Sequence, residues 1–81
     1  MEDEELLNSI LERLYKFSGG VSSVRNTLNE DGIFFRKNQL NRVMGDIRNN
    51  GFALVSRAED DYQAQISPEG VMYCEETLML R

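Results

Sequence analysis

Hydrophobic residues recur at intervals of three and four in the first half of the chain, the spacing that places them on one side of a helix. The first such stretch predicts a helix over residues 3–17, whose acidic first turn lies at the helix end that favours negative charge. The next predicts a short helix over 22–31, begun by Ser22 or Ser23 as the capping residue. A third predicts a helix over 36–50. Its inward side is formed by Leu40, Val43, Met44 and Ile47.

The outward side of the helix over 36–50 is basic and rich in amides. It carries Arg36, Lys37, Asn38, Gln39, Asn41, Arg42 and Arg48. The residues from Asn49 to Gly51 supply the left-handed conformation that ends a helix, so Phe52 can fold back onto its last turn. Gly45 lies inside the helix and weakens it by about 1 kcal/mol relative to alanine, so we expect another element to pack closely there.

After Gly51 the alternation of apolar and polar residues changes to a period of two, which predicts a β-hairpin over 52–66. Its turn contains Glu59, Asp60 and Asp61 and no glycine, so we expect a longer or mobile loop. Val21 stands alone between a glycine pair and a serine pair. It is expected either to pair with the hairpin as a one-residue strand or to fill the core.

The C-terminal pattern predicts a helix over 68–79, with Ser67 as its cap and Pro68 at its first position, where a missing amide is tolerated. Leu78, Met79 and Leu80 follow one another at the end of the pattern. Three consecutive apolar residues are costly in water, so we expect them to pack on the first helix or on a second copy. A homodimer through the first and last helices is therefore one hypothesis.

The connection formed by Ile33, Phe34 and Phe35 is unusually apolar for a loop. We expect at least two of these side chains to be buried between helices. Phe34 or Phe35 left exposed would instead mark a site for a partner.

The composition is that of a folded protein, and the length of 81 residues predicts one domain. Hydrophobic residues make up 41% and charged residues 28% of the chain, which is too apolar for a disordered segment. No run approaches the ~20 apolar residues of a membrane span, and the acidic start does not resemble a signal peptide. We therefore expect a cytoplasmic protein.

Charge is distributed unevenly along the chain. The net charge is −5, from 9 basic and 14 acidic residues. Residues 32–57 contain five basic residues and one acidic residue, a net +4, and the rest of the chain therefore has a net −9. An anionic partner would be attracted to one face and repelled by the others.

Catalytic and metal chemistry have little support. The chain has no histidine, the commonest general base and zinc ligand, and its one cysteine, Cys74, lies at an apolar position of a helix. We interpret Cys74 as a packing residue, and Glu59, Asp60 and Asp61 as a solvated turn. We expect no enzymatic activity, no metal and no cofactor.

Two stretches of the chain, together with the order of its elements, resemble the winged helix-turn-helix superfamily. Residues 40–55, LNRVMGDIRNNGFALV, resemble a recognition helix that runs into the first strand of the wing. Residues 62–70, YQAQISPEG, resemble the second wing strand with the Tyr-x-Leu-Thr-x-x-Gly pattern of MarR-like and PadR-like regulators. Here Ile66 and Ser67 replace the usual Leu and Thr. The resemblance implies an α+β winged helix.

The resemblance also implies a small transcriptional regulator that binds double-stranded DNA. In this superfamily the third helix commonly enters the major groove and the wing contacts the backbone. The implied base contacts are Asn38, Gln39, Asn41 and Arg42. The implied phosphate contacts are Arg36, Lys37, Arg48 and Arg57. Any one of these residues could equally belong to a solvated helix face.

The acidic wing argues against DNA, because Glu59, Asp60 and Asp61 would face phosphates of like charge. Asp46 on the third helix adds a smaller objection. The DNA hypothesis further requires Arg36, Lys37 and Arg42 to be free of carboxylates from this chain. The alternative is a winged helix that docks on another protein, for which an acidic surface is no handicap.

Overall fold

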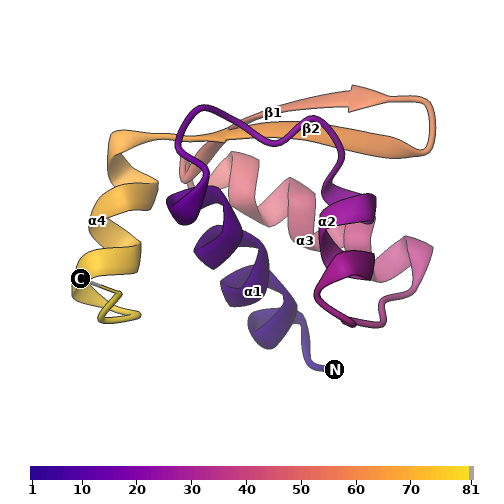
Figure 1. Cartoon of the computed structure of the whole chain (residues 1–81), viewed down its shortest axis with the longest axis horizontal. Coiled ribbons are helices and arrows are strands. Elements are labelled where there is room, and N and C mark those ends of the chain that lie inside the picture. The colour runs from indigo at the N-terminus through magenta and orange to yellow at the C-terminus, as the bar shows by residue number, and fades with distance from the viewer. Residues whose placement is uncertain (81) are drawn as a thin grey trace.

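The helices and the hairpin follow one another in the order that the hydrophobic pattern predicts. The structure is a computed structural model, and it describes residues 1–80. The elements are α1 (Asp3–Lys16), α2 (Val24–Glu30), α3 (Lys37–Asn49), β1 (Ala53–Ala58), β2 (Asp61–Ile66) and α4 (Pro68–Glu76). Figure 1 shows the hairpin lying above α1 and along α3, with α2 and α4 on opposite sides of α1. The predicted α+β class is confirmed.

The core lies between α1, α3 and the inner face of the hairpin. Its members on the three helices that precede the hairpin are Leu6, Ile10, Leu11, Leu14, Val24, Leu28, Leu40, Val43, Met44 and Ile47. Each is at most 2% exposed, and burying one such side chain contributes about 1.5–3 kcal/mol. This packing fixes the rotation of α3 and therefore decides which of its residues face outward. No helix within residues 1–80 is long and apolar enough to cross a membrane.

The end of α3 takes the form that its sequence predicts. Gly51 has a φ of 71°, and its amide donates to the Arg48 carbonyl. The Phe52 amide donates to the Ile47 carbonyl, so the chain folds back over the last turn of the helix. The Phe52 ring then packs on Tyr73 of α4, with 4.6 Å between the ring centroids. This stop sets the direction in which β1 leaves α3.

The hairpin turn is tighter than the sequence suggests. Ala58 pairs directly with Asp61, which leaves a two-residue turn, so the longer loop that was one of our two expectations is wrong. Glu59 takes a φ of 55°, the conformation that glycine usually supplies in such turns. On the other edge of β2, Val21 exchanges two backbone hydrogen bonds with Ala64. Val21 therefore acts as the one-residue strand that was one of its two expected roles.

The C-terminal helix ends at Glu76 rather than at residue 79. The Leu80 amide donates to the Cys74 carbonyl, which turns the last residues back toward the helix. Leu78 and Leu80 are partly buried against the core, whereas Met79 is 77% exposed. Two of the three apolar residues thus pack on their own chain, and the homodimer stays a prediction.

The expectation of a close contact at Gly45 is wrong. A Cβ atom placed on Gly45 would meet nothing within 4 Å. Gly45 therefore faces open space on α3, and no element of residues 1–80 accounts for a glycine there. The close approach occurs instead at Gly70 of α4, where a Cβ atom would lie 2.0 Å from the Phe52 carbonyl oxygen.

Candidate functional site

The outward side of α3 presents amide and guanidinium groups along its whole length. Arg36 precedes the helix. Asn38 and Gly45 lie on the side opposite the buried residues, and Arg48 lies at the border of that side, one turn after the buried Met44. Arg36, Asn38 and Arg48 are exposed. None of these three side chains has a hydrogen-bond or ion-pair partner within residues 1–80. They are available to a ligand.

The middle of the same face is covered by the N-terminal residues of the chain. Arg42 forms a two-pronged contact with Asp3, with Nε 2.8 Å from Oδ2 and an Nη atom 3.0 Å from Oδ1. The Gln39 amide donates to the Met1 carbonyl at 2.6 Å and to the Asp3 carboxylate at 3.2 Å. The hydrogen bond from Arg42 holds the pKa of the Asp3 carboxyl below its ordinary value. The segment Met1–Asp3 thus occupies two of the four expected base contacts.

Two further residues of this face contact the hairpin. The Tyr62 hydroxyl donates to the Asn41 side-chain oxygen, which fixes that amide against β2. The Lys37 amine lies 3.4 Å from an Asp60 carboxylate oxygen at the hairpin turn. The hairpin turn therefore lies near the start of α3, and the hairpin and the helix share one surface.

The condition set for DNA binding is met only in part. Arg36 is free of this chain's carboxylates among the described residues, whereas Lys37 and Arg42 are paired. Both pairs are exposed, with 59% or more of each cationic side chain accessible. Exposed ion pairs contribute little and are screened by salt, so a competing anion can replace either carboxylate.

Asp61 does not belong to a solvated acidic tip, contrary to our expectation. Its carboxylate accepts hydrogen bonds from the Ser23 hydroxyl and from the Arg25 and Tyr62 amides. Partial burial raises the pKa of this carboxyl, but these hydrogen bonds together outweigh it, so the pKa lies below its ordinary value. Asp61 therefore ties the turn end of the hairpin to the start of α2. Only Glu59 and Asp60 remain as the acidic tip.

Arg25 and Arg57 extend the basic surface beyond α3. The Arg57 Nε donates to the Glu59 carbonyl, and its guanidinium lies 5.7 Å from the centre of the Tyr62 ring. Arg25 donates to the Asp60 carbonyl at 3.0 Å. Sequence reasoning missed Arg25, because its only signal is its place in the first turn of a short helix. Both side chains lie close to the hairpin turn that approaches Lys37.

The loop before α3 displays one aromatic side chain to solvent. Ile33 and Phe35 are partly buried against the core, as expected for two of the three apolar loop residues. Phe34 lies between them and is 90% exposed.

The one cysteine of the chain lies in the core, away from this face. Cys74 is fully buried, its thiol donates to the Leu11 carbonyl, and burial raises the pKa of the thiol to about 11. No group of three or more acidic or cysteine residues within residues 1–80 could hold a metal ion. These contacts make Cys74 a packing residue, as the sequence predicts.

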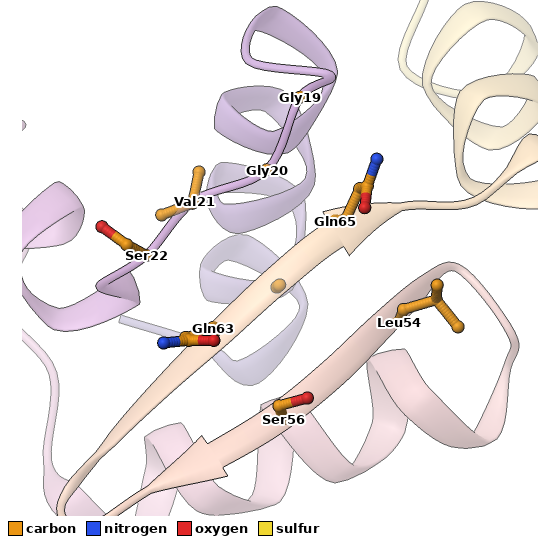
Figure 2. Close-up of a pocket in the computed structure, with 9 residues that line it drawn as sticks. Gly19, Gly20, Val21, Ser22, Leu54, Ser56, Gln63 and Gln65 are labelled. Atoms are coloured by element: carbon orange, nitrogen blue, oxygen red, sulfur yellow. The ribbon is translucent and has the colours of Figure 1, made fainter.

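An open hollow lies on the outer face of the hairpin, away from α3 (Figure 2). Leu54 and Ser56 of β1, Gln63 and Gln65 of β2 and the segment 19–22 line it, and none of them is charged. The hollow therefore offers hydrogen-bonding amides and hydroxyls but no group that could attract an anion or move a proton at neutral pH.

Comparison of the chain with protein-family models, with curated proteins and with solved structures gave no match.

Proposed function

We propose that this chain is a winged helix that binds double-stranded DNA through the outward side of α3, as a small non-enzymatic regulator. The order of elements supports the winged-helix assignment, with α3 running directly into a hairpin whose turn contacts the start of that helix. The excess of cations on α3 and at Arg36 just before it supports an anionic ligand. DNA is the anion for which a basic, amide-bearing helix is suited.

The observation that carries the proposal is that Asn38, Gly45 and Arg48 have no partner among residues 1–80 on the part of α3 that faces away from the core. Gly45 weakens the helix, and no element of residues 1–80 packs against it. A glycine facing outward lets the helix backbone approach a ligand closely. Asparagine can contact adenine through two hydrogen bonds, and arginine can contact guanine or a phosphate. A helix lying deep in the major groove would use all three features.

The remaining contacts follow from the same placement. Arg36 and Arg48 are unpartnered and would contact phosphates, together with Lys37 and Arg57 near the hairpin turn. Arg42 and Gln39 would reach base edges once DNA has displaced the N-terminal segment. The fork that Arg42 now makes with a carboxylate is the same geometry with which it would bind guanine or a phosphate.

The carboxylates of this chain make the proposed binding weak and sensitive to salt. Glu59 and Asp60 at the hairpin turn repel phosphates, and Asp3 competes for Arg42. Asp61 is held by the Ser23 hydroxyl and the Arg25 amide, which lower its pKa and keep it ionised, so it adds to the negative charge at this turn.

Replacing Arg36 or Arg48 with alanine is expected to weaken DNA binding and to make it less dependent on salt. With four phosphate contacts, affinity for a labelled duplex of mixed sequence should fall roughly 100-fold between about 50 and 200 mM salt. Each substitution should reduce the slope of log affinity against log salt by about 1. Fluorescence polarisation at several salt concentrations measures both quantities.

Lys16→Ala serves as the matched control, because it removes one positive charge from α1, where Lys16 pairs with Glu12. Its effect on affinity and slope should be clearly smaller than that of Arg36→Ala. Equal effects of the three substitutions would mean that only net charge matters. Absence of binding by the wild type at low salt would remove the DNA proposal.

A further inference from the structure

A hydrogen bond joins the hairpin to the proposed DNA-binding helix, from the Tyr62 hydroxyl of β2 to the Asn41 side-chain oxygen of α3. Tyr62 is only 7% exposed, so core packing fixes its ring, and its hydroxyl meets Asn41 from one direction. The Arg57 guanidinium lies 5.7 Å from the centre of the same ring. Tyr62 therefore touches one of the expected base contacts and one of the expected phosphate contacts.

This contact engages one end of the Asn41 amide and leaves the other end free. The oxygen accepts the Tyr62 hydroxyl, whereas the Nδ2 atom has no hydrogen-bond partner within residues 1–80. Among those residues the one buried side-chain nitrogen or oxygen without a partner is Arg13 Nε, so Asn41 Nδ2 is in contact with solvent. The amide therefore offers its donor to a ligand, while this chain holds its acceptor.

Asn41 adjoins two residues that carry the proposed DNA-binding face. Asn38 lies three residues before it and Gly45 four residues after it, so each is its neighbour on the surface of α3. Asn38 has no partner, so its amide can donate to adenine N7 and accept from adenine N6 at once. The Asn41 amide would have to leave Tyr62 to do the same. The two asparagines are therefore suited to different bases.

We propose that Tyr62 is a positioning residue, which orients the Asn41 amide so that it donates to a base edge and favours guanine over adenine. In the major groove guanine presents two acceptors, N7 and O6, whereas adenine presents N7 beside an amino group that donates. An amide that offers only its N–H group matches the acceptors of guanine. This inference rests on the proposed binding of DNA and adds to it the base that one residue reads.

The test compares base preferences, measured by selecting bound duplexes from a pool with randomised positions and sequencing them. Asn41→Ala identifies the base pair that Asn41 contacts, as the position whose preference it removes. There the wild type should favour guanine. Tyr62→Phe keeps the ring but lacks the hydroxyl, so the amide can rotate, and the ratio of adenine to guanine should rise about fivefold. The slope of log affinity against log salt should stay unchanged, because no charge is removed.

Tyr73→Phe is the matched control, because it removes a hydrogen bond of the same kind at another place. The Tyr73 hydroxyl of α4 donates to the Asn8 side-chain oxygen of α1 at 3.0 Å. This variant should keep the base preference of the wild type. If Tyr62 had only a structural role, Tyr62→Phe would weaken binding to all sequences alike and leave the ratio of adenine to guanine as it is.

Three results would overturn the role of Tyr62 while leaving DNA binding intact. They are an unchanged ratio of adenine to guanine in Tyr62→Phe, a wild type that favours adenine at the position of Asn41, and an Asn41→Ala variant that alters no position. A wild type that binds no duplex of the pool at low salt would remove the DNA proposal and this inference together.

Discussion

Gly70→Ala is expected to lower the free energy of unfolding by about 3 kcal/mol, because it forces a side chain into a contact between backbones. The new Cβ atom would lie 2.0 Å from the Phe52 carbonyl oxygen and 2.7 Å from the Ile66 side chain. The Phe52 carbonyl also accepts the Ser67 amide, so it cannot move without loss of that hydrogen bond. The substitution therefore separates α4 from the hairpin. Urea unfolding followed by circular dichroism measures the loss.

Gly45→Ala is the matched substitution, and it is expected to raise the free energy of unfolding instead of lowering it. Because a Cβ atom at Gly45 meets nothing within 4 Å, alanine should stabilise α3 by about 1 kcal/mol through helix propensity alone. If both glycine substitutions changed stability equally, the close packing at Gly70 and the open space at Gly45 would both be wrong.

Asp61→Ala is expected to lower the free energy of unfolding by about 2 kcal/mol, since it removes a charged acceptor from three donors. The Arg25 amide belongs to the first turn of α2 and would lose its side-chain partner. The Ser23 hydroxyl, which also caps α2 at the Asn26 amide, would lose its contact with the hairpin. Thermal and urea unfolding should both show the decrease.

The pH dependence of stability provides a second measurement of the role of Asp61. Because the folded-state pKa of Asp61 is lowered, its stabilisation is present above the ordinary pKa of a carboxyl and is lost as pH falls through the lowered value. Asp61→Ala should therefore lose stability less steeply than the wild type on acidification. Asp60→Ala is the control. The Asp60 side chain is 74% exposed, so this substitution should change the free energy of unfolding little. Similar acid profiles for wild type and Asp61→Ala would contradict this role.

The elements of the fold could be predicted from the sequence because their signals are local. Leu40, Val43, Met44 and Ile47 show the period of a helix. Gly51 ends it, and Ser67 with Pro68 starts the next one. These features depend on residues within a few positions of one another. The exact end of α4 could not be predicted, because Leu78 and Leu80 continue the apolar pattern without continuing the helix.

The candidate site could be predicted only as a list of polar residues on one helix. Which of them are free depends on partners distant in sequence, such as Asp3 for Arg42 and Tyr62 for Asn41. The sequence predicts that Glu59, Asp60 and Asp61 form one acidic hairpin tip. In the structure Asp61 alone faces α2. No sequence pattern separates these cases, because they are decided by how the hairpin and the N-terminal segment pack on α3.

The central claim is that DNA binds the outward side of α3 by replacing the carboxylate that now holds Arg42, and Asp3→Asn tests it most directly. In a polarisation titration of labelled duplex at low salt, Asp3→Asn should bind about fivefold more tightly than the wild type. Glu4→Gln removes one negative charge from the neighbouring position and should give a clearly smaller gain. Equal gains for the two variants, or no binding by either, would contradict the account.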